Sequence, residues 1–187
     1  MTAWGCRMEG NAALAGVALS VLTALLTWLM MSLLQTLSHR YLGHSPLGGK
    51  FYRNHIAFHH TYYSHAALVS EKYLGKEGNN TPYFLPSVVL VGLLVYLILP
   101  ITLVAVQITT MSVSFYAHVY LDKQYHVKQS WLNRFAWFKR KQERHFAHHL
   151  HAACNYAVVD NFWDMLFGTY QRSAELTSES RVPVAEA

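Results

Sequence analysis

The chain has 187 residues, enough for one domain, and only 13% of them are charged, against about 25% in a typical soluble domain. With 52% hydrophobic residues, this composition excludes an ordinary soluble protein with a charge-rich surface. The net charge of +5 requires no nucleic-acid partner, because a basic face against anionic lipid headgroups accounts for it. We expect a single domain over residues 1–172 and a short polar tail, 173–187, that is disordered.

The first predicted element is a membrane-spanning helix over residues 12–37. No Asp, Glu, Lys, Arg or His occurs between Asn11 and Ser38, and uncharged apolar stretches of about 18 residues or more are typical of membrane spans. At about 1.5 Å per residue, the segment is long enough to cross a hydrocarbon core of about 30 Å with some tilt. The alternative is a buried helix of a soluble core, which rarely runs this long without a charge.

A second apolar region, residues 81–117, also contains no Asp, Glu, Lys, Arg or His and is too long for one span. Pro100 lies near its middle, and proline removes a backbone donor and clashes with the preceding turn. We therefore predict a helical hairpin with arms at residues 83–99 and 101–120. Alternatively, the hairpin enters the membrane without crossing it completely.

The basic residues predict the topology. Only Arg7 precedes the first span, and the other 14 of the 15 lie in residues 38–80 or after residue 120. The positive-inside rule assigns those segments to the cytoplasm and the N-terminus to the opposite side. The sequence therefore predicts an all-α, multi-pass integral membrane protein with about three transmembrane helices.

All 12 histidines lie on that cytoplasmic side or at its membrane boundary, and eight of them form three clusters: His39 and His44; His55, His59 and His60; His145, His148 and His149. In the last cluster, spacings of three and four residues place the imidazoles on one face of a helix. A regular helix would separate His39 from His44 by about 140°, so their joint use requires the helix to end or loosen near Gly43. The clusters predict a cytoplasmic helical metal site.

Neutral imidazole suits iron, zinc and copper as a ligand, and eight histidines exceed the four ligands of a tetrahedral zinc ion. We therefore expect two ions. No Asp or Glu has a histidine three residues later, so the Glu-x-x-His motif of soluble di-iron bundles is absent. His118 lies at the end of the last predicted span and Asp122 and His126 follow it, and any of the three can complete the site.

These clusters resemble those of the fatty acid hydroxylase superfamily, which includes sterol desaturases, sphingolipid hydroxylases and carotenoid hydroxylases. Residues 155–156 and 162–170 look like the C-terminal signature of the same superfamily, and the resemblance covers residues 38–170. Asp122 stands where a further histidine is expected. The residues that the resemblance and the spacing nominate as metal ligands are His39, His44, His55, His59, His60, His118, His126, His145, His148 and His149.

The resemblance implies a non-haem di-iron oxygenase that hydroxylates or desaturates a lipid chain with O2. Zinc can replace iron in the purified protein. Electrons would come from NAD(P)H through a separate electron-transfer protein, since no donor domain is visible in the sequence. Fatty acyl, sphingoid, sterol and carotenoid substrates all stay open. Asp160, Asp164 and Asn155 are candidates to accept the second ring-nitrogen proton of a metal-bound histidine.

A histidine-rich membrane protein that binds or transports metal without redox catalysis is the alternative. An ion path across the membrane requires ionisable residues inside the spans, whereas Gln35 and Gln107 are the most polar side chains there. A zinc hydrolase is a further rival, but the sequence has no His-Glu-x-x-His motif.

Overall fold

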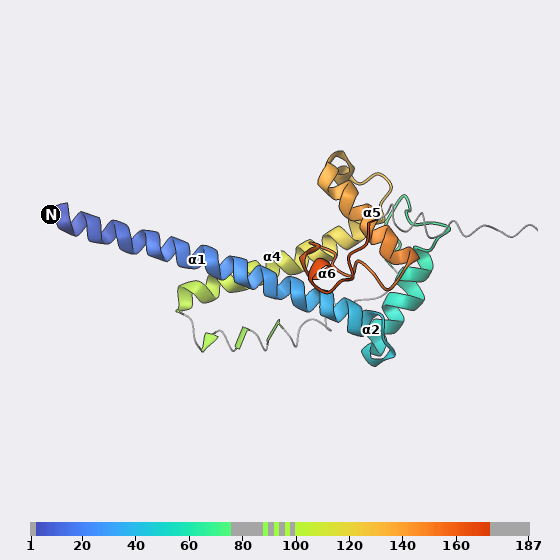
Figure 1. Ribbon diagram of the computed structural model, residues 1–187, viewed down its shortest axis with the longest axis horizontal. Helices are drawn as coiled ribbons and strands as arrows, with labels where there is room; N and C mark the ends of the chain where they lie inside the picture. The colour runs from blue at the N-terminus through green and yellow to red at the C-terminus, as the bar shows by residue number, and fades with distance from the viewer. Residues whose placement is uncertain (1–2, 76–87, 90–91, 94–95, 98–99, 173–187) are drawn as a thin grey trace, which may run out of the picture.

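The computed structural model describes residues 3–75, 88–89, 92–93, 96–97 and 100–172, and this part of the chain is helical, with no strand. A long helix, α1 (Ala3–Ser38), and a shorter one, α4 (Ile101–Tyr125), lie side by side (Figure 1). Both helices are long and apolar enough to cross a membrane. The predicted arm at residues 83–99 and the predicted disordered tail lie mostly or wholly outside the described residues.

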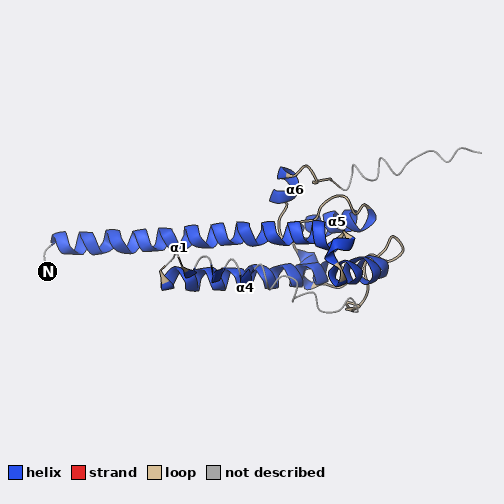
Figure 2. Ribbon diagram, turned by 90° about the horizontal axis from the view of Figure 1, so that it is seen from below, coloured by secondary structure: helices blue, strands red, loops and turns tan. Residues whose placement is uncertain are grey.

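The two long helices point in the same direction along the molecule (Figures 1 and 2). Their shared face buries Thr27, Met31 and Gln35 of α1, each one turn from the next, against a matching row on α4. That row consists of Leu103, Gln107, Met111 and Ser114. Leucines on the other faces, such as Leu22 and Leu25, are exposed, as lipid-facing residues would be.

The helix boundaries follow local chemistry. Pro100 precedes α4 in an extended conformation, and its carbonyl accepts the first hydrogen bonds of the helix, so the predicted break at this proline is correct. α4 continues five residues past the predicted end at residue 120, because its last turn packs outside the apolar stretch. There the ring of Tyr125 is fully buried against Leu132, Phe138 and Val158.

A compact helical head lies at the C-terminal ends of α1 and α4 (Figure 1). It contains two π-helices, η1 (His39–Gly43) and η3 (Arg53–His60), and two short elements between them, η2 (Pro46–Gly48) and α2 (Lys50–Tyr52). The rest of the head is formed by η4 (Trp131–Arg134), α5 (Ala136–Leu150) and α6 (Phe162–Leu166). All the clustered histidines belong to this head or to the helix ends that enter it.

Candidate metal centre

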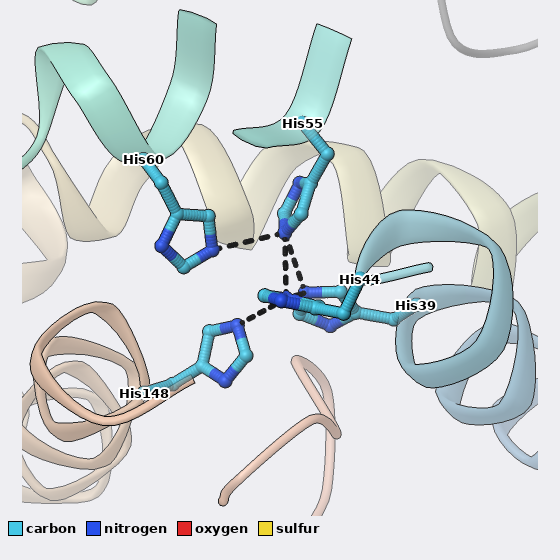
Figure 3. A group of neighbouring side chains, drawn as sticks. All are labelled: His39, His44, His55, His60 and His148. Carbon is cyan, nitrogen blue, oxygen red and sulfur yellow. Dashed lines mark hydrogen bonds between the residues drawn. The ribbon is translucent and has the colours of Figure 1, made fainter. Parts of the chain in front are cut away.

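Nine histidines of the head gather into two groups whose ring nitrogens lie within 4.8 Å of one another in each group. The first histidine group is His39, His44, His55, His60 and His148 (Figure 3). The second histidine group is His59, His126, His145 and His149. All nine are among the ten histidines nominated from the sequence. The tenth, His118, is half-buried on α4 and belongs to neither group.

The two π-helices explain the membership of the first group. A π-helix bonds residue i to i+5, so its wider turn brings residues five apart toward the same side. His39 and His44 are five apart around η1, and their Nε2 atoms approach to 3.3 Å. His55 and His60 are five apart on η3, with Nε2 atoms 3.1 Å apart. The expected loosening near Gly43 is thus present, and a Cβ at Gly43 would lie only 3.3 Å from the rings of His39 and His55.

Neighbouring histidines in the sequence separate into different groups. On η3, His60 joins the first group and His59 the second; on α5, His148 joins the first, while His145 and His149, one turn apart, share the second. Rings from the two groups stack on each other, with His60 and His149 centroids 4.2 Å apart. The two groups therefore adjoin.

Four of the nine rings are held by backbone carbonyls, which accept a hydrogen bond from the Nδ1–H. The four contacts are His39 to Tyr156 (2.6 Å), His148 to Cys154 (2.6 Å), His126 to Leu68 (2.8 Å) and His149 to Tyr63 (2.8 Å). Each contact places the ring proton on Nδ1 and leaves a lone pair on Nε2, the atom that faces the rest of the group.

The imidazoles are held in their neutral form. Burial lowers the pKa of His44 to about 2, of His60 to about 3 and of His126 to about 4. It also lowers the pKa of five more deeply buried rings well below the ordinary value: His55, His59, His145, His148 and His149. Neutral rings at neutral pH have the lone pairs that a metal ion needs.

The contacts between the Nε2 atoms fit a metal ion. The Nε2 of His55 lies 2.9 Å from that of His39 and 3.1 Å from those of His44 and His60 (Figure 3). In the second group, His145 lies 2.9 Å from His126 and 3.1 Å from His149. One proton on a neutral ring cannot serve two or three such contacts, whereas one cation among the lone pairs satisfies all of them. The donor set therefore fits a transition-metal ion in each group.

The segment from Cys154 to Ala157 carries two of the accepting carbonyls, and Asp164 holds it in place. The buried Asp164 carboxylate accepts hydrogen bonds from the amides of Tyr156 (2.9 Å) and Ala157 (2.8 Å) and from the Thr169 hydroxyl (2.8 Å). The sequence-based expectation was a direct contact with a histidine. Asp164 instead binds the backbone that in turn binds His39.

Asn155 and Asp160, the other two residues predicted to accept a proton from a histidine ring, instead form hydrogen bonds that hold the C-terminal part of the chain. Asn155 adopts a left-handed conformation (φ 52°), and its amide side chain bonds to the backbone of Gln171 at both ends, with N–O distances of 3.0 and 3.1 Å. Asp160 accepts a hydrogen bond from Ser32 on α1 and another from the amide of Phe162. The hydrogen bond between Ser32 and Asp160 attaches this part of the chain to α1.

Sequence reasoning missed Lys141, whose amine is buried behind the same segment. It donates to the Ala157 carbonyl (3.2 Å) and to Asn161 Oδ1 (2.6 Å). Burial lowers the pKa of Lys141 to about 8, although Asp160 and Asp164 oppose the shift. It stands in a basic run, Lys139 to Lys141, where nothing in the local pattern marks one lysine as buried.

One carboxylate lies beside the second group. Asp122 Oδ1 is 3.5 Å from His145 Nε2 and 4.0 Å from His59 Nε2. The Asp122 side chain is 24% exposed, whereas that of His145 is 3% exposed.

Comparison with protein-family models gives a match to the fatty acid hydroxylase family over residues 24–169. The matched region begins inside α1, includes every member of both histidine groups and ends after α6. Comparisons with curated proteins and with solved structures gave no match.

Proposed function

The chain belongs to the fatty acid hydroxylase family, and on that premise we propose that it is a membrane di-iron oxygenase that hydroxylates or desaturates a lipid chain. The family supports an oxidoreductase of the hydroxylase or desaturase type. The observation that carries the proposal is the pair of adjoining groups of neutral imidazoles, each with the donor set of one transition-metal ion.

We assign one iron ion to each histidine group. Metal–nitrogen bonds of about 2.1 Å place two ligands about 3.0 Å apart at a right angle and about 3.4 Å apart in a tetrahedron. The Nε2 separations of 2.9–3.3 Å within the groups match these values, so the rings are placed as ligands of one ion in each group would be. We leave His118 out of the ligand set because it lies outside both groups.

Two bound iron ions would supply the electrons that turn dioxygen into an oxidant able to attack an unactivated C–H bond. The protein contributes position. His39 continues directly from α1 and His126 follows α4, so the two long helices lead from the apolar region to the histidines. A lipid chain lying along these helices would end beneath the two groups. The electrons would come from NAD(P)H through a separate carrier protein.

The topology proposed from the basic residues gains support from the direction of the helices. α1 and α4 point the same way along the molecule, so both would cross a membrane in the same direction (Figure 1). This common direction fits an odd number of crossings, as in three spans with the histidines on the cytoplasmic side and the N-terminus on the other.

The rival is a metal-binding or metal-transport protein. A transport path requires ionisable groups between the helices, but the polar side chains buried between α1 and α4 are uncharged, among them Gln35, Gln107 and Ser114. This observation favours catalysis at the membrane face over passage of an ion through the helix pair.

The test begins with metals per chain, measured by elemental mass spectrometry on detergent-purified protein from iron-supplemented cells. We expect about two ions per chain, because two ligand sets are present, and a sharp loss when His148 and His149 are both changed to alanine. His151→Ala is the matched control, since His151 is exposed one turn further on and belongs to neither group.

Cells expressing the wild-type protein should then accumulate a lipid that has gained an oxygen atom or lost two hydrogens, and the double variant should not. An iron-loaded protein with a functioning reductase but no oxidised lipid would favour the binding protein. One ion or fewer, unaffected by the double substitution, would contradict the di-metal centre.

A further inference from the structure

The two histidine groups differ in ligand number and in charge. The first has five imidazoles and the second has four, and the carboxylate of Asp122 lies at the edge of the second. The sequence left open whether Asp122, His118 or His126 completes the site. In the structure His126 belongs to the second group and His118 belongs to neither, which leaves Asp122 as the candidate for an additional ligand.

Asp122 lies in the last turn of α4, and His126 is the residue that directly follows this helix. The two residues are four apart at the end of α4, so their side chains leave the same face of the helix. Asp122 Oδ1 then reaches 3.5 Å from His145 Nε2, on α5, and 4.0 Å from His59 Nε2, on η3. The carboxylate therefore points toward nitrogens from both of the other elements that build the second group.

These distances suit two ligands of one ion. With bonds of about 2.1 Å, two ligands of the same metal lie about 3.0 Å apart at a right angle and about 4.2 Å apart when they face each other across the ion. The distances from Asp122 to His145 and His59 fall inside this interval. Asp122 is not among the four residues whose ligand atoms all lie within 4.8 Å of one another, so its carboxylate has to turn further toward the group when the ion binds. Three separations among the histidines of the group, 2.9–3.1 Å, fall at the lower end of the interval.

Charge favours the same assignment. Neutral imidazoles leave the full charge of a divalent ion in a buried site, and a buried charge needs a compensating partner. A carboxylate ligand supplies one negative charge, and its hard oxygen suits iron in either oxidation state better than it suits copper. In contrast, both carboxylate oxygens of Asp164, which lies near the first group, already accept hydrogen bonds from the amides of Tyr156 and Ala157.

We propose that Asp122 is the fifth ligand of the ion held by His59, His126, His145 and His149, which makes the two ions chemically different. The proposal rests on the di-metal centre proposed above. One ion has five imidazole ligands, and the other has four imidazoles and one carboxylate.

The test uses the full-length protein in detergent, loaded anaerobically with isotopically enriched ferrous iron alone and measured by Mössbauer spectroscopy and by metal analysis. The wild-type protein should give two distinct ferrous signals of equal area. In Asp122→Ala, one signal should shift or disappear while the other stays, and the affinity for that ion should fall by more than the roughly 10- to 100-fold that loss of an outer-shell partner costs, because the site loses a charged ligand. Asp122→His supplies an imidazole instead and should restore two ions with an altered second signal.

Glu71→Gln is the matched control. Glu71 is an acidic residue of the same head, it is 65% exposed, and it pairs with Lys128 at 3.0 Å instead of a histidine. Its removal should leave both signals and both affinities unchanged. This control separates a ligand effect from a general loss of negative charge on the head.

Two signals that remain unchanged in Asp122→Ala would overturn the assignment of Asp122 and leave the di-metal centre standing. Fewer than two ions in the wild-type protein would instead remove the di-metal centre itself, so the two failures are distinguishable. If Asp122→Ala does not fold, Asp122→Asn decides, since it keeps the shape and removes the charge. An unchanged second signal in that variant overturns the proposal.

Discussion

The first and second histidine groups take rings from η3 and α5 in common, but each is supported by a different piece of backbone. The first is completed by the end of α1 and rests on the carbonyls of Cys154 and Tyr156, in the C-terminal segment. The second is completed by the end of α4 and rests on the carbonyls of Tyr63 and Leu68, in the segment that follows η3. The two supports share no residue.

The two groups therefore contact each other through their rings, but the backbone segments that hold them are separate. A change in a ring from η3 or α5 alters one group directly and touches the other through stacking, as between His60 and His149. A change in a supporting segment should reach only the group that rests on it. Substitutions of decreasing severity can therefore test whether the two groups behave as separate sites.

The largest effect is expected from single ring removals on α5. His148→Ala should cost the first group its ion and His149→Ala the second, so each variant should retain about one ion per chain. Metal analysis gives the count, and Mössbauer spectra of ferrous-loaded samples show which signal is lost. The separation of the two groups would be contradicted if both variants lost the same signal, or if each lost both ions.

An intermediate effect is expected from Asp164→Ala. The substitution leaves the buried amides of Tyr156 and Ala157 without their acceptor, at a cost of about 1–3 kcal/mol for each unsatisfied group. The carbonyl that holds His39 would move, so the affinity for the first ion should fall by about 10- to 100-fold while the second ion is retained. Competition with a chelator measures both affinities.

Asp164→Asn provides the internal comparison, because the amide keeps one oxygen acceptor in the same place. It should recover part of the lost affinity. Equal loss of both ions in Asp164→Ala would mean that the C-terminal segment supports the whole head and not the first group alone.

The smallest effect is expected from Tyr63→Phe. The hydroxyl of Tyr63 accepts a hydrogen bond from the Leu74 amide at 2.8 Å, and losing it should lower the stability by about 1 kcal/mol. The ring that stacks on His126 at 3.9 Å and the carbonyl that holds His149 both remain. Thermal unfolding should show a small decrease with both ions in place. Tyr63→Leu, which also removes the stacked ring, should weaken the second ion and spare the first.

The apolar helices, the break at Pro100 and the histidines that form both groups could be predicted from the amino-acid sequence. These features depend on local properties: a run of uncharged side chains, a residue without a backbone donor, and imidazoles repeated at short spacings. The arm expected at residues 83–99 stays a prediction, and so do the three spans and the side of the membrane on which the histidines lie.

The division of the histidines into two groups depends on the folded arrangement of the helices. Spacing on a regular helix links His55 with His59, whereas the wider turn of η3 gives His55 to the same group as His60. The four supporting carbonyls left no trace in the sequence, because every residue has a carbonyl and only the folded chain brings a particular one to a ring. The positions of Asp122 beside the second group and of Lys141 behind the C-terminal segment likewise depend on the elements that pack against them, and not on their neighbours in the chain.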